Sequence, residues 1–111
     1  MKAITRIIFL DENGEKFFGE GPYCLLVETE KSGSLHTSAK TMGMSYSKAH
    51  KLIKNAENVL GFSILERTVG GINGGGSYLT EKGKEWVSKY EKYRDACVET
   101  NGKLYKEIFS E

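Results

Sequence analysis

The middle of the chain, residues 33–61, carries two short runs of apolar residues at helical spacing. The first run places its apolar members four and then three positions apart, at Leu35, Ala39 and Met42. The second run is longer and contains Ala49, Leu52, Ile53, Ala56, Val59 and Leu60. Each spacing puts the apolar side chains on one face of a helix. The pattern therefore predicts two consecutive amphipathic helices.

Polar residues and a glycine predict where these two helices begin and end. Ser34 and Ser45 each precede a run, and a serine hydroxyl can accept one of the free N–H groups at a helix start. Gly43 follows the first run and suits the left-handed conformation found just past helix ends. A helix, a glycine-containing turn and a second capped helix form a helix-turn-helix.

The residues before this unit predict a β-hairpin and one more helix. Residues 2–18 are rich in strand formers on both sides of Asn13-Gly14, which is a strong hairpin signal. A helix over residues 22–31 follows. It opens on Pro22, the only proline, which fits a first helical turn because its missing N–H needs no partner there.

A second hairpin is predicted after the helix-turn-helix. Residues 62–69 and 77–79 are strand-like, and five of the seven residues from 70 to 76 are glycine. A hairpin at this position is a wing, and its glycines allow backbone N–H groups to approach phosphate oxygens closely. The alternative, a nucleotide-phosphate loop, requires a GxGxxG or P-loop spacing followed directly by a helix. The string GINGGG does not have that spacing.

The last segment predicts a long helix capped by Thr80. Its apolar stripe follows the rhythm of a coiled-coil seam and consists of Trp86, Tyr90, Tyr93, Cys97 and Leu104. We expect two copies to pair along this stripe as a homodimer. Alternatively the stripe packs back on its own domain, as we expect for Trp86 and Val87. Asn101-Gly102 predicts a break, with residues 103–109 as a separate short helix.

The predicted fold is α+β and mainly helical: a winged helix-turn-helix with an N-terminal β-hairpin, a β-wing and a long C-terminal dimerisation helix. Residues 1–80 would be the DNA-binding domain and residues 81–111 the dimerisation helix of the same folding unit. The apolar run 7–10 is too short for a signal peptide or a membrane span. We therefore expect a cytoplasmic location.

Charge is distributed unevenly along a chain whose formal net charge is only +1. No acid occurs between Glu30 and Glu57, so residues 31–56 carry +5. The lysines in this interval are Lys31, Lys40, Lys48, Lys51 and Lys54. An acid-free basic segment on a helix-turn-helix is typical of a surface that docks phosphates.

The residues expected to contact DNA lie on the two helices and the wing. They are Ser34, Thr37, Lys40, Ser45, Tyr46, Ser47, Lys48, His50, Lys51, Lys54, Arg67, Thr68, Asn73, Gly74 and Gly75. Lys48 and Lys51 could reach either phosphates or guanine O6 and N7. Tyr46 either contacts DNA or packs between helices, and the two serines act mainly as caps.

The chain resembles a known family in two strings, LLVETEKSGSLHTSAKTMGMSYSKAHKLI and LGFSILERTVGGINGGGSYLTEKG. They are similar to the N-terminal DNA-binding domain of molybdate-responsive (ModE-type) transcription regulators and, more distantly, to the LysR-type helix-turn-helix. The resemblance runs over about residues 18–90 and implies a dimeric winged helix that binds operator DNA. His50 differs from the Trp common in the family.

The resemblance also bears on ligands. The oxyanion-binding domains of the full-length regulators have no counterpart in this chain, so it looks like a standalone form. We expect neither molybdate nor another oxyanion to bind within it.

Other functions are less well supported by the residues. Cys24 and Cys97 lie on apolar helical faces and predict buried thiols rather than a disulfide or metal site. We expect no metal, no cofactor and no enzymatic activity, because no catalytic cluster is recognisable. The main alternative is a winged helix that binds another protein and no DNA.

Overall fold

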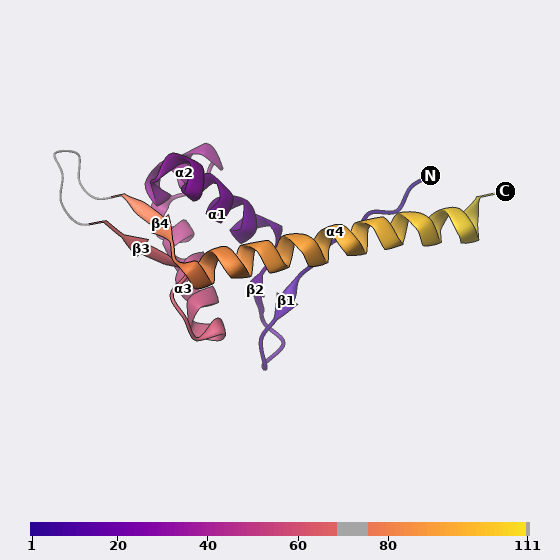
Figure 1. The fold of residues 1–111 in the computed structure, drawn as a ribbon, viewed down its shortest axis with the longest axis horizontal. Coiled ribbons are helices and arrows are strands. Elements are labelled where there is room, and N and C mark those ends of the chain that lie inside the picture. The colour runs from indigo at the N-terminus through magenta and orange to yellow at the C-terminus, as the bar shows by residue number, and fades with distance from the viewer. Residues whose placement is uncertain (69–75, 111) are drawn as a thin grey trace.

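The computed structural model describes residues 1–68 and 76–110. Within them lie four helices and four short strands (Figure 1). In chain order they are β1 Phe9–Leu10, β2 Lys16–Phe18, α1 Glu20–Ser32, α2 Leu35–Thr41, α3 Tyr46–Leu60, β3 Leu65–Arg67, β4 Ser77–Leu79 and α4 Glu81–Phe109. This order confirms the predicted mainly helical winged helix-turn-helix.

The strands form two separate antiparallel pairs. In the first, β1 and β2 pair Phe9 with Phe18; in the second, β3 and β4 pair Leu65 with Leu79. Both hairpins are shorter than predicted. Residues 2–8 and 62–64 are not strand because the opposing strands β2 and β4 end at Phe18 and Leu79, just before α1 and α4.

The residues predicted to cap the helix starts do so. Ser34 Oγ accepts the N–H of Thr37, and Ser45 Oγ accepts that of Lys48. Thr80 caps α4 in the same way. Helix α1 begins earlier than predicted, at Glu20 rather than Pro22. The proline still lies in the first turn, where its missing N–H leaves no helical bond unmade.

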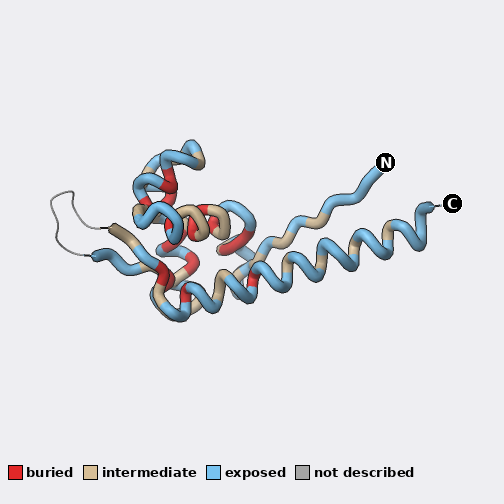
Figure 2. The backbone as a smooth tube through the Cα atoms, turned by 45° about the horizontal axis from the view of Figure 1, so that its top comes forward, coloured by how far each residue is buried: buried red, intermediate tan, exposed pale blue. Residues whose placement is uncertain are grey.

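The core lies where α1, α2, α3, the strands and the start of α4 meet (Figure 2). Its buried apolar residues are Phe18, Leu25, Leu26, Leu35, Ala39, Ala49, Ile53, Ala56, Ile64, Leu79 and Tyr90. The predicted faces of α2 and α3 supply five of these, whereas Val59 is exposed. The buried hydroxyls of Thr29 and Ser38 bond to each other at 3.1 Å, which satisfies two polar groups inside the core.

Helix α4 is continuous through Asn101-Gly102, so the predicted break and separate short helix are wrong. The Asn101 amide donates to Thr5 Oγ1 at 2.7 Å, and the Gly102 backbone is helical. A glycine costs a helix only about 1 kcal/mol, which cooperative hydrogen bonding on both sides can offset. The distal half of α4 projects from the body beside the N-terminal segment, in a molecule 62 Å long (Figure 1).

Candidate nucleic-acid interface

The exposed side of the first turns of α3 carries the basic face predicted from the sequence. Ser47, Lys48 and Lys51 are exposed there, while Ala49 and Ile53 point into the core. Neither lysine forms an ion pair with any carboxylate in the described part of the chain. Both ammonium groups are therefore free to meet phosphates or base edges at the end of α3 that helix-turn-helix proteins insert in the major groove.

Lys54, one turn further on, is already engaged. Its ammonium lies 3.3 Å from Glu57 Oε1, although its side chain is 60% exposed. Glu57 is the less exposed partner, at 9%, so the ammonium of Lys54 is held at the edge of the basic face. Among the lysines predicted to contact DNA, Lys54 is the one whose ammonium group already pairs with a carboxylate.

An aromatic and basic cluster lies at the N-terminal end of α3. The Tyr46 ring lies between His36 of α2 and His50 of α3, with ring centres 5.6 and 5.9 Å away. Arg67 of β3 donates a hydrogen bond to the Tyr46 hydroxyl, and its guanidinium carbon lies 5.7 Å from the ring centre. The structure thus brings together three predicted site residues from two elements. His36, which the predicted set omitted, completes the cluster.

Tyr46 is half-buried, which bears on the two interpretations left open by the sequence. Its ring packs between helices, and its hydroxyl orients a cation of the wing strand. The packing interpretation holds for the ring. Tyr46 also positions Arg67 at the edge of the basic face.

Helix α2 presents a second exposed group beside α3. Thr37 and Lys40 are exposed on it, and Lys40 forms no ion pair with a described carboxylate. Ser34 is occupied as the cap, as expected. These groups lie where the first helix of a helix-turn-helix crosses the phosphate backbone.

The strands of the wing hold the remaining described candidates. Thr68 Oγ1 accepts the N–H of Gly76 at 2.6 Å, and the Gly76 carbonyl accepts the N–H of Thr68 at 2.9 Å. Thr68 therefore links the two strands of the wing through Gly76. Its side chain is exposed. Asn73, Gly74 and Gly75 lie outside the described residues.

Besides His36, sequence reasoning missed Glu57, which also shapes this surface. Its side chain is 9% exposed, and its Oε2 accepts the backbone N–H groups of Ile64 at 2.7 Å and Leu65 at 3.2 Å. The signal available in the sequence was its place as the first acid after the basic interval. What it bonds to depends on the path of the chain after α3, which spacing alone does not give.

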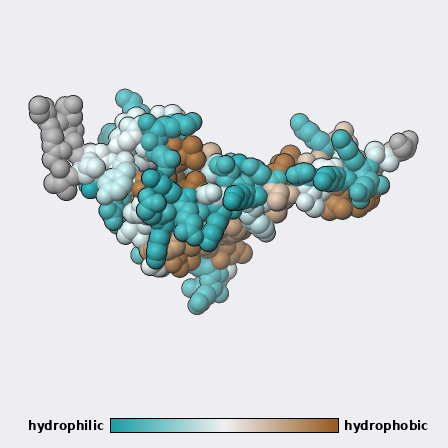
Figure 3. All heavy atoms as spheres, in the orientation of Figure 1, coloured by the Kyte–Doolittle hydropathy of each residue, from teal (hydrophilic) through white to brown (hydrophobic). Residues whose placement is uncertain are grey.

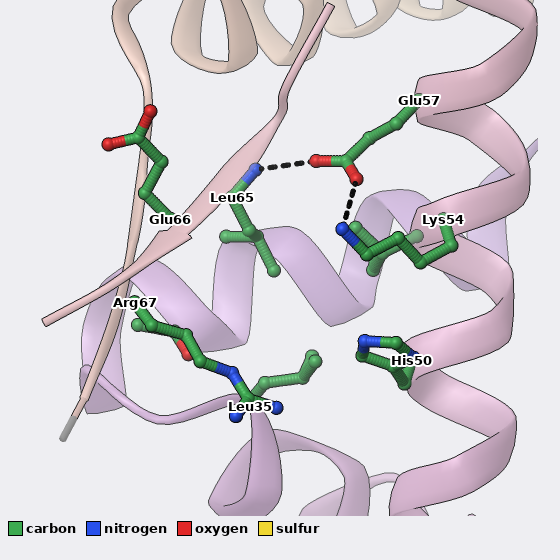
Figure 4. A pocket seen from close by; sticks show the side chains of 9 residues that line it. Leu35, His50, Lys54, Glu57, Leu65, Glu66 and Arg67 are labelled. Carbon is green, nitrogen blue, oxygen red and sulfur yellow. Dashed lines mark hydrogen bonds and ion pairs between the residues drawn. The ribbon is translucent and has the colours of Figure 1, made fainter. Parts of the chain in front are cut away.

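A small cavity of about 180 Å³ lies between α3 and β3 (Figure 4). Lys54 and Glu57 line it from the helix, and Glu66 and Arg67 line it from the strand. The charges in its wall balance, so it is not a pocket for an anion such as a phosphate. It separates two points where the strand is attached to the helix.

The predicted dimerisation stripe is only partly exposed. Tyr90, predicted for dimerisation, is 1% exposed and packs on Phe9, Phe18 and Tyr23 of its own domain. Trp86 is half-buried against Phe18 of the N-terminal hairpin, as the alternative anticipated. The reason is that β1 and β2 cover the first turns of α4, which the sequence pattern of a single helix does not show.

The distal half of α4 keeps an apolar surface. Four large apolar residues are about half exposed or more there: Val98, Leu104, Ile108 and Phe109. Tyr93, just before this half, is also exposed. Cys97 is half-buried. Figure 3 shows apolar side chains gathered toward the outer end of this helix.

A helix-turn-helix with an unpaired basic face, followed by a β-hairpin, defines a winged helix-turn-helix protein. A family model matches residues 24–84, more than half of the chain, and is described as bacterial regulatory helix-turn-helix protein, lysR family. The chain belongs to this family. A family of regulators also agrees with the expectation that the chain is not an enzyme.

Curated relatives are regulators of the ModE type. The chain is 33% identical over 67 residues to the Transcriptional regulator ModE of Yersinia pestis, and 35% over 66 residues to the Molybdenum transport protein ModE of Azotobacter vinelandii. It is 34% identical over 67 residues to the DNA-binding transcriptional dual regulator ModE of Escherichia coli K12. Each match covers 60% of this chain and 26, 24 and 26% of the respective relative. The resemblance predicted from the sequence is confirmed, and the chain spans about a quarter of those relatives.

Among the described residues, no helix is both long enough and apolar enough to cross a membrane. The longest, α4, carries charged side chains of both signs along its length.

Proposed function

We propose that this chain binds double-stranded DNA in a sequence-specific manner and regulates transcription in the cytoplasm as a homodimer. The observation that carries the proposal is the pair of exposed, unpaired lysines on the first turns of α3, Lys48 and Lys51. Membership in a family of regulatory helix-turn-helix proteins supports it.

In this proposal α3 lies in the major groove with its N-terminal turns toward the base edges. Lys48, Lys51 and Ser47 meet bases or phosphates there. Thr37 and Lys40 contact the phosphate backbone from α2. Arg67, oriented by Tyr46, contacts the backbone or the minor groove beside α3.

The dimer is proposed from the distal half of α4. Its exposed apolar residues include Leu104, Ile108 and Phe109, and the body of the same chain does not cover them. Two such helices side by side would bury the surface, and the two winged helices would then read a two-fold symmetric site. Under this proposal residues 1–80 bind DNA and residues 81–111 bind the second copy.

The test is binding to a fluorescein-labelled random-sequence duplex, followed by anisotropy over a salt series. We expect micromolar affinity that falls steeply as salt rises, with a log–log slope of about −0.9 per phosphate contact. Selection from a random library should then enrich a preferred site. Absence of binding at low salt would contradict the proposal and favour a winged helix that contacts another protein.

A further inference from the structure

The wing strand β3 is attached to the recognition helix α3 at two separate points. At one end, the Glu57 carboxylate accepts the N–H groups of Ile64 and Leu65 at 2.7 and 3.2 Å. At the other end, Arg67 donates to the hydroxyl of Tyr46. Between the two attachments lies the cavity of Figure 4. The strand therefore does not pack continuously on the helix. Its pairing with β4 holds it in the hairpin, and the two attachments join that hairpin to α3.

The spacing of the attachments agrees with the lengths of the two elements. Tyr46 and Glu57 are 11 residues apart on α3, which is about 16 Å at ~1.5 Å per residue. Ile64 and Arg67 are three residues apart, which is about 10 Å of extended chain. The long arginine side chain spans the remaining distance to Tyr46.

The Glu57 attachment lies at a rigid junction. Ile64 is fully buried, and its carbonyl accepts the N–H of Thr80 at 2.9 Å. Because Ile64 is buried, its N–H needs a partner inside the fold, and the Glu57 carboxylate is that partner. Two hydrogen bonds to one ionised oxygen are stronger than neutral ones, so this side chain fixes where β3 starts.

We propose that Glu57 is a positioning residue for DNA binding, because it sets the place at which the wing strand presents Arg67 beside the basic face of α3. This inference rests on the proposed DNA-binding function. Glu57 itself touches no DNA. Its side chain is only 9% exposed, and its negative charge would repel a phosphate.

Two conservative variants separate positioning from charge. Glu57→Asp keeps the negative charge but is one methylene too short to reach both N–H groups. Glu57→Gln removes the charge but keeps an acceptor oxygen at the same reach. If Glu57 acted only through its charge, the Glu57→Asp variant would bind DNA as tightly as the parent. The Glu57→Gln variant would bind DNA more tightly than the parent.

The positioning role predicts the opposite for Asp. We expect Glu57→Asp to bind a labelled duplex about three- to tenfold more weakly than the parent, which corresponds to roughly 1 kcal/mol. Its log–log salt slope should be shallower by about 0.9, the value for one phosphate contact. We expect Glu57→Gln to bind at least as tightly as the parent. Glu66→Gln, which removes a charge from β3 while leaving the attachment intact, is the control for charge alone and should not weaken binding.

A double-mutant cycle with Arg67→Ala completes the experiment. In the parent, Arg67→Ala should weaken duplex binding. In the Glu57→Asp background the same substitution should weaken binding by less than about twofold, because the arginine is already misplaced. Circular dichroism confirms that each variant is folded at the temperature of the binding assay. Equal losses from Arg67→Ala in both backgrounds, or parental affinity of Glu57→Asp, would overturn the inference. A parent that binds no duplex would instead contradict the proposed function, and the inference with it.

Discussion

The hydroxyl of Tyr90 donates a hydrogen bond to Glu20 Oε2 at 2.9 Å and so joins α4 to the first turn of α1. Arg94, one turn further along α4, pairs with the other oxygen of Glu20 at 2.8 Å. The Arg94 guanidinium also lies 4.8 Å from the centre of the Tyr23 ring. These contacts fix the direction in which α4 leaves the body. They also make the stability of the fold depend on the protonation of Tyr90.

The free energy of unfolding should fall at high pH, and part of this fall should depend on Tyr90. Burial and the hydrogen bond to Glu20 raise the pKa of Tyr90 above the usual value of about 10. Since the folded-state pKa is the higher one, this contribution is fully present below about pH 10 and is lost as pH rises toward the folded-state pKa. Urea unfolding between about pH 8 and about pH 11 measures it.

Tyr90→Phe is the variant that isolates this effect. We expect it to lose about 1–2 kcal/mol of unfolding free energy at pH values where the phenol is protonated, because Glu20 loses a hydrogen-bond donor. Its stability should then decrease less than that of the parent as pH rises. Identical pH dependence in the two proteins would show that Tyr90 does not carry the effect.

Two glycines of α4 should respond to alanine in opposite directions. A Cβ on Gly83 would lie 2.4 Å from the Ile64 carbonyl oxygen, while a Cβ on Gly102 would meet nothing within 4 Å. We expect Gly83→Ala to destabilise the protein by about 1–3 kcal/mol through overpacking. Gly102→Ala should stabilise it by up to about 1 kcal/mol.

The measurement is urea unfolding of both variants beside the parent. Gly102→Ala also tests the continuity of α4, because alanine stabilises this position only if it lies inside a helix. A destabilising Gly102→Ala would contradict a helix that runs through residue 102.

The proposed dimer should depend on the distal half of α4. Leu104→Glu places a charge in the exposed apolar surface and should shift sedimentation equilibrium from the dimer toward the 12.4 kDa single chain. Ser88→Glu adds the same charge to an exposed position on the other side of α4 and should leave the dimer intact. A parent that sediments as a single chain at micromolar concentration would contradict the proposed dimer.

Local signals predicted most of the fold. The caps Ser34, Ser45 and Thr80 were identified because a short-range hydrogen bond needs only the right residue beside an apolar run. The left-handed turn at Gly43, where φ is 71°, was predicted for the same reason. Such features depend on neighbours in sequence, which the sequence displays directly.

The errors that bear on the site mostly involve residues that are distant in sequence. Tyr90 was assigned to the dimerisation stripe because the helical pattern does not show that β1 and β2 cover it. The break at Asn101-Gly102 was predicted from propensity, which helix cooperativity and the contact with Thr5 override. The bonds of Glu57 to Ile64 and Leu65 likewise require knowledge of where the chain goes after α3.

The assignment of the basic face is tested most directly by replacing Lys48 and Lys51 together. In the double alanine variant, the log–log salt slope of duplex binding should become shallower by about 1.8, corresponding to two lost phosphate contacts. Unfolding free energy should stay within about 0.5 kcal/mol of the parent, because both side chains are exposed. The matched control replaces Lys89 and Lys103 with alanine. These two exposed lysines of α4 pair with Glu85 and Glu99.

The measurement is fluorescence anisotropy with the same duplex and salt series for all three proteins. A shallower slope for the Lys48 and Lys51 variant, together with a parental slope for the control, is the predicted result. The same slope and affinity in the variant and the parent would contradict the claim that α3 presents the DNA-binding surface.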